Sequence, residues 1–218
     1  LGAGDIVLTS RRAPDADAQR VIEEITEQYR CRIHVFAADV GDESDVAKLL
    51  ERIRAELPPL AGVAHLAGVL DDALLSQQSL ERFRTTLAPK AFGACHLDRL
   101  TKDDDLDFFI VSSSVSSVFG SPGQANYATA NALLDGLVAQ RRAQGLPATG
   151  VNFGPWARGG MASSEAARTN LSAQGLMPLE PSAALSARKR PGWAAGPIVG
   201  AILWIRPPVR VPRGTSDA

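Results

Sequence analysis

Cysteine is scarce in this chain, which has only Cys31 and Cys95 among its 218 residues. Neither lies in a Cys-x-x-Cys pair or a Cys/His cluster, so the sequence offers no disulfide framework and no metal site. The three histidines, His34, His65 and His96, also lack metal-ligand spacing, and we expect packed or surface roles for them. Two unpaired thiols fit a reducing compartment, and they predict a cytoplasmic location.

Long hydrophobic runs and an excess of one charge are also lacking. The longest apolar run, residues 194–205, has 12 residues, including a proline and two glycines. A membrane span needs about 18. Lys and Arg total 23 and Asp and Glu total 24, for a net charge of −1. Such a balance gives no electrostatic reason to expect nucleic acid as a partner. The composition predicts an ordinary globular domain without a membrane span.

Short apolar segments alternate with longer amphipathic ones along the chain. The apolar segments predict strands at 5–10, 32–38, 60–66, 107–113 and 149–153. The amphipathic segments predict helices at 15–29, from a cap at Ser44 to Pro58, at 79–100 with an interruption near Pro89, at 125–144 and at 164–174. This alternation predicts an α/β fold, with a parallel sheet covered by helices on both faces. Ligands of such folds bind beyond the carboxyl ends of the strands.

The last 31 residues differ in composition from the rest. Residues 188–218 hold six Lys or Arg, five prolines and a single acid, Asp217. We expect residues 1–187 to form one domain and 188–218 to be an atypical basic, proline-rich tail outside the fold. The abrupt change suggests the hypothesis that the tail arises from a shifted reading frame.

Four polar residues could gather around one reactive carbonyl. Ser114 lies just past a predicted strand, and Tyr127 opens the predicted helix at 125–144. Asn131 follows Tyr127 by one turn and shares its helix face. A phenol has a pKa of about 10, and a nearby cation such as Lys90 would lower it. This spacing predicts a hydroxyl and a phenol that converge on one oxygen atom.

These residues belong to a longer series of motifs in a fixed order. The series resembles the ketoreductase domain of modular or iterative polyketide synthases, a branch of the short-chain dehydrogenase/reductases, over residues 1–187. The motifs that carry it are Leu8-Thr-Ser-Arg-Arg12, Ala38-Asp-Val40, His65-Leu-Ala-Gly-Val69, Leu70-Asp-Asp72, Pro89-Lys90, the serine run before Val115, Gln124-Ala-Asn-Tyr-Ala-Thr-Ala-Asn131 and Asn152-Phe-Gly-Pro-Trp156. The resemblance implies a Rossmann-like, doubly wound parallel sheet. The family's first strand, glycine-rich turn and first helix would precede Leu1, so it also implies an N-terminally truncated domain.

The resemblance assigns a catalytic role to each of the four polar residues. Tyr127 would donate the proton, and Ser114 would hydrogen-bond the substrate carbonyl. Lys90 would tune Tyr127, and Asn131 would support the proton relay. In most short-chain reductases a lysine occupies the place of Asn131. This departure matches polyketide ketoreductases and disfavours an NAD-dependent epimerase.

The cofactor implied by the resemblance is NADPH. Arg11 and Arg12 end the first predicted strand, where an acid would favour NAD, and guanidinium groups suit a 2′-phosphate. The residues that would bind the cofactor are Ser10, Arg11, Arg12, Asp39, Val40, Ala67, Gly68, Gly154 and Pro155.

A further motif concerns the configuration of the product. Leu70-Asp71-Asp72 resembles the Leu-Asp-Asp signature of B-type ketoreductases, and Pro122 and Asn126 agree with it. This implies a D-configured 3-hydroxyl group. Taken alone, the acidic pair is more typical of a helix start.

The function implied is reduction of a 3-oxoacyl thioester on an acyl carrier protein, during polyketide or complex-lipid biosynthesis. The partners would be the carrier protein with its phosphopantetheine-linked chain and the other synthase domains. The alternative is a non-catalytic structural fragment that contacts neighbouring domains of the synthase.

Overall fold

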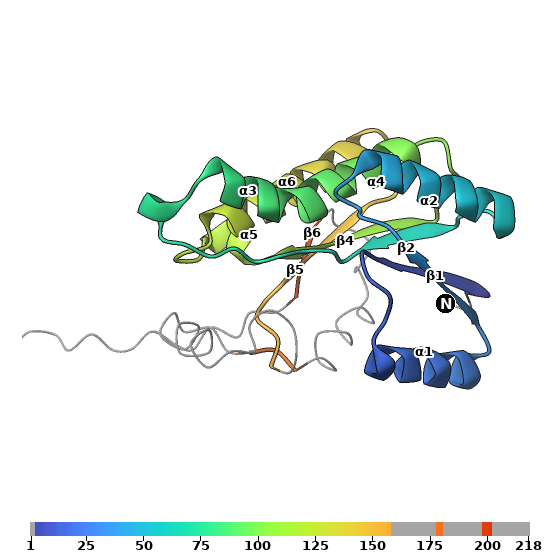
Figure 1. Ribbon diagram of the computed structural model, residues 1–218. Coiled ribbons are helices and arrows are strands. Elements are labelled where there is room, and N and C mark those ends of the chain that lie inside the picture. The colour runs from blue at the N-terminus through green and yellow to red at the C-terminus, as the bar shows by residue number, and fades with distance from the viewer. Residues whose placement is uncertain (1–2, 158–177, 181–197, 202–218) are drawn as a thin grey trace, which may run out of the picture.

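The computed structural model describes residues 3–157, 178–180 and 198–201, as Figure 1 shows. The predicted helix at 164–174 lies outside these residues. The elements in chain order are β1 (Asp5–Ser10), α1 (Ala16–Tyr29), β2 (Arg32–Ala37), α2 (Glu43–Glu56), β3 (Gly62–His65), η1 (Leu75–Gln77), α3 (Leu80–Leu87), η2 (Ala88–Phe92), α4 (Gly93–Leu100), β4 (Phe108–Ser114), α5 (Ser116–Phe119), α6 (Ala125–Ala143), β5 (Thr149–Phe153) and β6 (Ile198–Ala201).

All pairs among the described strands are parallel, as the alternating pattern predicted. The strands β1 and β2 form one sheet, and β3, β4, β5 and β6 form another in that order. The fold is thus the predicted parallel α/β arrangement, but its strands divide into two sheets. Among the described strands, β1 pairs only with β2, and β3 pairs only with β4.

Helices lie on both sides of the strands. Figure 1 shows α2, α4 and α6 on one side and α1 on the opposite side of β1 and β2. The core fills the space between the strands and the first group of helices. It includes Phe36, Val46, Leu50, Ile53, Val63, Ala94, Leu97, Phe109, Val111, Leu134 and Val138. Helix α1 buries none of its residues, so it adds little to this core.

Polar side chains determine where the helices begin. The Asp15 carboxylate accepts from the Ala18 N–H at 2.9 Å, which starts α1 as expected. The predicted cap of α2, Ser44, is wrong, because α2 already begins at Glu43. Asp42 takes that role, and its Oδ1 accepts from the Asp45 N–H at 3.1 Å. Both residue types are good caps, so the sequence alone did not separate them.

The interruption near Pro89 is a widened helical turn. Residues of η2 form a π-helix between α3 and α4. Pro89 has no N–H to donate, which removes one regular helical bond. The Gly93 N–H is shared between the carbonyls of Ala88 and Lys90, five and three residues earlier. Lys90 lies on the buried side of this turn.

One strand comes from the segment that was expected to lie outside the fold. β6 lies within 188–218 and pairs with β5, with Val199 opposite Val151. The residues of β6 are apolar or glycine, and their backbone extends the sheet. The basic, proline-rich composition of the segment did not indicate such a strand. The boundary at residue 187 remains a prediction, since the flanking residues lie outside those described.

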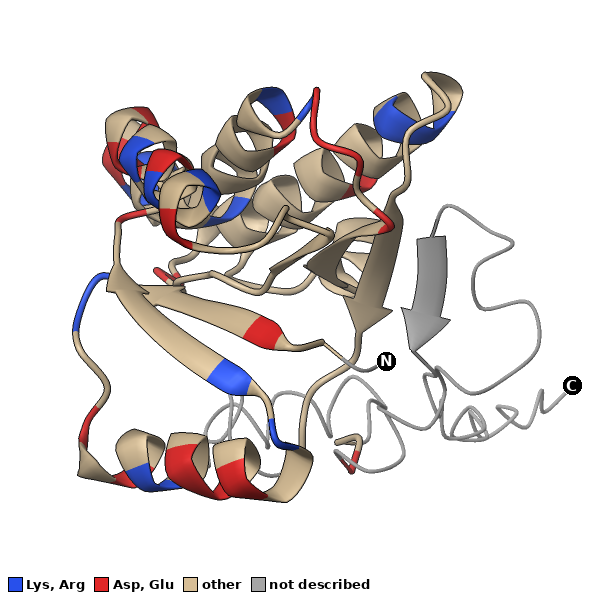
Figure 2. Cartoon of the chain, turned by 90° about the vertical axis from the view of Figure 1, so that its right-hand side faces the viewer, with Lys and Arg blue, Asp and Glu red and all other residues tan. Residues whose placement is uncertain are grey.

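Charge on the described surface is mixed in sign. Figure 2 shows basic and acidic residues interspersed along the helices. In the part of the chain that the structure describes, no helix is long and apolar enough to cross a membrane. The same residues contain no group of three side chains that could hold a metal ion.

Candidate active site

The carboxyl ends of the strands meet in one region. β4 and β5 are neighbours, and Ser114 at the end of β4 lies opposite Phe153 at the end of β5. The segment that follows β2 and the last residue of β3 both lie against Gly93. A methyl group added to Gly93 would lie 3.1 Å from the carbonyl oxygen of Val40, after β2, and 3.2 Å from Cε1 of His65, at the end of β3. The two sheets therefore direct their carboxyl ends toward the same part of the molecule, where ligands of α/β folds bind.

Lys90 lies inside this region and is only 2% exposed. Its Nζ donates to the Ser112 carbonyl at 2.9 Å and lies 5.3 Å from the centre of the Tyr127 ring. Burial lowers the pKa of Lys90 to about 8, and the negative charge of Asp135 opposes this in part. The ammonium is thus held over the face of the tyrosine.

Tyr127 is the third residue of α6 and is 9% exposed. Burial raises the pKa of its phenol, while hydrogen bonds with the side chains of Asn131 and Ser114 act in the opposite direction. These influences place the phenol near the side chains of Ser114 and Asn131, and their convergence on a carbonyl stays a prediction. The expected lowering of this pKa by Lys90 is not found, because burial outweighs the other influences.

Ser114 and Asn131 are held by further hydrogen bonds. The Ser114 hydroxyl oxygen accepts from the Ser116 N–H at 3.2 Å. Asn131 is fully buried, and its amide donates to the Tyr127 carbonyl at 2.7 Å. The backbone carbonyl of Asn131 accepts a hydrogen bond from the Ser113 hydroxyl at 3.2 Å. Among the described residues, the side-chain oxygen of Asn131 has no hydrogen-bond partner. The Ser113 hydroxyl thus ties β4 to the backbone of α6, while the Asn131 amide bonds within α6 to the residue one turn earlier.

A second polar group that the sequence did not single out lies behind these residues. Asp135 Oδ2 accepts from the Ser117 hydroxyl at 2.6 Å and from the Asn152 amide at 3.2 Å. Asp135 follows Asn131 by four residues, so the helical spacing was a signal that could have found it. The negative charge of this carboxylate raises the pKa of Lys90 and so partly offsets the effect of burial.

The residues expected to bind the cofactor follow the strand ends. Arg11 and Arg12 are exposed just after β1, and neither forms an ion pair within the described residues. Asp39 follows β2, and its Oδ1 accepts from the Gly41 N–H at 2.9 Å. The others also lie at strand ends, namely Ser10 on β1, Val40 after β2, Ala67 and Gly68 after β3, and Gly154 and Pro155 after β5. Two free guanidinium groups at this edge fit a phosphate-bearing dinucleotide.

The residues of the stereochemical motif come from two segments that lie side by side. The Asn126 amide donates to the Asp71 carbonyl at 2.8 Å and to the Thr86 hydroxyl at 3.1 Å. The Gln124 amide donates to Asp72 Oδ2 at 2.9 Å. Leu70 is half-buried and Pro122 is exposed. The loop that follows β3 is thereby fixed against the start of α6, next to Tyr127.

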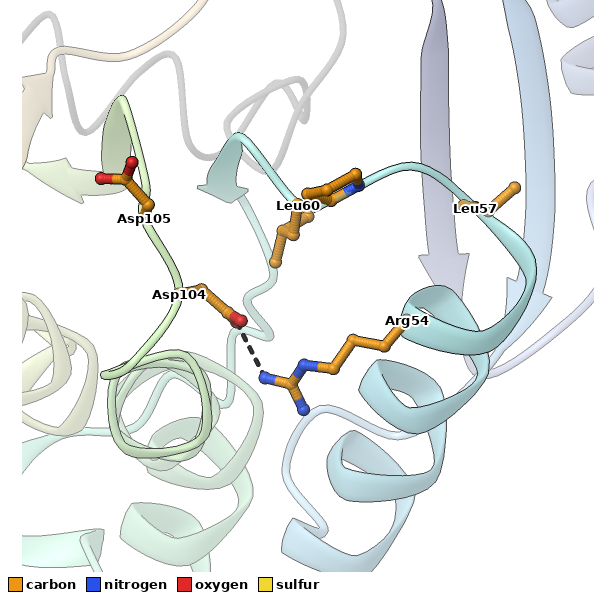
Figure 3. A pocket seen from close by; sticks show the side chains of 6 residues that line it. Arg54, Leu57, Leu60, Asp104 and Asp105 are labelled. Atoms are coloured by element: carbon orange, nitrogen blue, oxygen red, sulfur yellow. Dashed lines mark hydrogen bonds and ion pairs between the residues drawn. The ribbon is translucent and has the colours of Figure 1, made fainter.

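A separate hollow lies at the opposite edge of the strands. Figure 3 shows it between the end of α2 and the loop before β4, where Arg54 Nη2 lies 2.8 Å from Asp104 Oδ2. The strands β3 and β4 begin on this side, at Gly62 and Phe108. It therefore does not belong to the site that contains Lys90 and Tyr127.

Comparisons with known proteins point to one family. The model of the family described as "KR domain" matches residues 1–158. Polyketide synthase GfsB of Streptomyces halstedii is 43% identical over 198 residues, which cover 91% of this chain and 4% of that protein. The phenolphthiocerol synthesis polyketide synthase Pks15/1 of Mycobacterium marinum is 40% identical over 187 residues, which cover 84% of this chain and 9% of that protein. The chain thus spans a small share of these synthases.

Solved structures agree with the sequence relatives. A structure of A-type ketoreductases from a modular polyketide synthase has a TM-score of 0.84 and 39% identity, covering 92% of this chain and 42% of that chain. The first ketoreductase of the tylosin synthase has a TM-score of 0.79 and 41% identity, covering 91% of this chain and 43% of that chain. The Rossmann-like fold predicted from the sequence is confirmed.

Proposed function

The chain belongs to the KR domain family, the ketoreductases of polyketide synthases, and from this premise we propose that it reduces a 3-oxoacyl thioester with NADPH. The thioester would be carried on an acyl carrier protein of the same cytoplasmic, multidomain synthase. The product would be the D-configured 3-hydroxyacyl thioester of a B-type ketoreductase. Both cysteines are free thiols, which supports the cytoplasmic setting.

The observation that carries this proposal is the gathering of Ser114, Tyr127 and Lys90 at the carboxyl ends of the strands. A bound nicotinamide would supply the hydride. Negative charge then develops on the substrate oxygen, where the Ser114 hydroxyl and the Tyr127 phenol can donate hydrogen bonds. Tyr127 releases its proton to that oxygen as a general acid. The Lys90 ammonium lies 5.3 Å from the centre of the Tyr127 ring, and in the proposed step it would offset the charge of the phenolate that forms, although burial keeps the pKa of the resting phenol raised.

The contacts of the Leu70-Asp71-Asp72 loop support a product of one configuration, and the resemblance of this motif to the B-type signature supports D. Asn126 and Gln124 bond to this loop from the segment that leads into Tyr127. A substrate between the loop and Tyr127 would present one face of its carbonyl to the cofactor. Pro122 lies in the same segment.

Incubation of the chain with NADPH and a 3-oxoacyl thioester, free or on a carrier protein, tests the proposed function. We expect NADPH to be consumed and the product to be a single enantiomer of D configuration in chiral chromatography. Absence of turnover by the folded chain would instead favour a structural fragment. An L-configured product would refute the B-type assignment alone.

Cofactor choice should depend on Arg11 and Arg12. In the double variant Arg11→Ala/Arg12→Ala we expect the KM for NADPH to rise by about 10- to 100-fold, because hydrogen bonds to a charged group are worth about 1.5–3 kcal/mol each. Turnover with NADH should not fall, since NADH has no 2′-phosphate. Steady-state kinetics with both cofactors provides the measurement. Arg20→Ala, an exposed change on α1, serves as the control. An equal loss with both cofactors would contradict the assignment.

The rate should fall on the alkaline side as Lys90 loses its proton. Because burial lowers the pKa of Lys90 to about 8, the ammonium is present below this pH and is lost above it. We therefore expect kcat to decline above pH 8. In Lys90→Met, turnover should be low and this decline should be absent. A profile of kcat against pH is the measurement.

The exposed lysines Lys48 and Lys102 offer matched controls for this profile. Lys48→Met and Lys102→Met should keep the alkaline decline of the unaltered chain. If Lys90→Met also kept it, the titrating group would be another residue.

A further inference from the structure

We propose that His65 is a positioning residue that holds Lys90 in place for the reaction, through a hydrogen bond from its imidazole to the Lys90 carbonyl. This inference rests on the proposed ketoreduction for its catalytic consequence. His65 Nε2 lies 2.8 Å from the Lys90 carbonyl oxygen. A carbonyl can only accept, so the Nε2 atom carries the proton in this contact.

The irregular backbone around Lys90 makes such a contact useful. Lys90 lies in the π-helical turn η2, where the Gly93 N–H is divided between two carbonyls. Turns of this kind are frequent at functional sites. The imidazole therefore stabilises the carbonyl of the very residue whose side chain the site uses.

Two neighbouring strands, β3 and β4, fix the backbone and the side-chain ammonium of Lys90, respectively. His65 is the last residue of β3 and lies opposite Val111 of β4. Ser112, the next residue of β4, accepts from Lys90 Nζ at 2.9 Å. The backbone of Lys90 is thus fixed by one strand and its ammonium by the adjacent strand. Loss of either contact would free the lysine to move relative to Tyr127.

The surroundings of His65 keep its ring in place. The side chain is 3% exposed, and burial lowers the pKa of the imidazole, which favours the neutral ring. Gly93 packs against the ring, because any side chain there would come within 3.2 Å of Cε1. The ring therefore has little room to turn away from the Lys90 carbonyl.

Two substitutions separate the hydrogen bond from the packing. His65→Phe keeps a ring of similar shape but has no donor, whereas His65→Gln keeps an amide donor at a similar reach. We expect kcat of His65→Phe to fall by about 10- to 100-fold, because small displacements of reacting groups can slow a reaction to this extent. His65→Gln should regain most of this loss, and the KM for the thioester should change little in both. His34→Phe, on β2, is the control that should keep kcat.

A chemical measurement decides the inference without relying on turnover. Reductive methylation followed by mass spectrometry compares Lys90 with the exposed Lys48 and Lys102. In His65→Phe, Lys90 should be modified faster, while in His65→Gln it should stay protected. The buried thiol of Cys31 reports general opening of the fold when it is alkylated.

The outcomes distinguish failure of this inference from failure of the proposed function. If the unaltered chain does not turn over, the proposed function fails, and the labelling still tests the placement of Lys90. The inference is overturned if Lys90 labelling in His65→Phe is unchanged, or if it rises only together with that of Cys31. If the unaltered chain is active and His65→Phe has the same kcat, the inference is also overturned.

Discussion

Replacing Tyr127 by phenylalanine is expected to lower kcat by about 10²–10⁴-fold, the usual contribution of a positioned general acid. The change removes only the phenolic oxygen. The ring can keep its place near Lys90 and Ser114, so we expect the KM for the thioester to change little. Steady-state kinetics with NADPH and a 3-oxoacyl thioester is the measurement.

The chain offers a matched control for this substitution. Its only other tyrosine, Tyr29, lies at the end of α1 and is largely exposed. Tyr29→Phe removes the same atom and should leave kcat as it is. If Tyr127→Phe retained most of the turnover, another group would have to supply the proton, and the proposed mechanism would fail.

The largest effect on stability is expected at Arg141, which is almost fully buried. This side chain bonds to Asp98 on α4 and stacks over the Phe109 ring at 4.1 Å. Its Nε also donates to the Pro147 carbonyl at 3.2 Å. In Arg141→Met we expect the free energy of unfolding to fall by about 3 kcal/mol, because a buried pair that loses one partner leaves a charge uncompensated. The value is at the low end for such pairs, since Asp98 is 22% exposed and can regain some water.

An exposed ion pair provides the comparison. Arg99 on α4 bonds to Glu43 at the surface, and Arg99→Met should change stability little. Urea unfolding of both variants, followed by circular dichroism, gives the two values. Equal midpoints for Arg141→Met and the unaltered chain would show that the buried pair is not a determinant of stability.

Local signals were sufficient to predict most strands and helix starts. β1 and β5 have the bounds that the sequence predicted, because each is an apolar run between polar residues, glycine or proline. The interruption near Pro89 was also predicted, but its form was not. A missing N–H indicates a break, while the wider turn depends on how α3 and α4 pack. The choice of Asp42 over Ser44 as a cap similarly required the structure.

Spacing predicted Ser114, Tyr127 and Asn131 as members of the candidate site, and Lys90 was predicted as a nearby cation that would lower the pKa of Tyr127. Their catalytic roles stay predictions, and the structure differs from the expectation in its electrostatics. The raised pKa of Tyr127 was missed, because burial depends on tertiary packing that no local pattern encodes. His65 was expected to have a packed or surface role, and its contact with Lys90 joins residues far apart in the sequence.

The placement of the candidate site residues on different elements has a consequence for engineering this domain. The arginines proposed to select the dinucleotide follow β1, whereas Ser114 and Tyr127 lie on β4 and α6. These two sets lie on different elements of the chain. A designer could therefore exchange coenzyme preference by redesigning the turn between β1 and α1, and Ser114 and Tyr127 would not need to be changed.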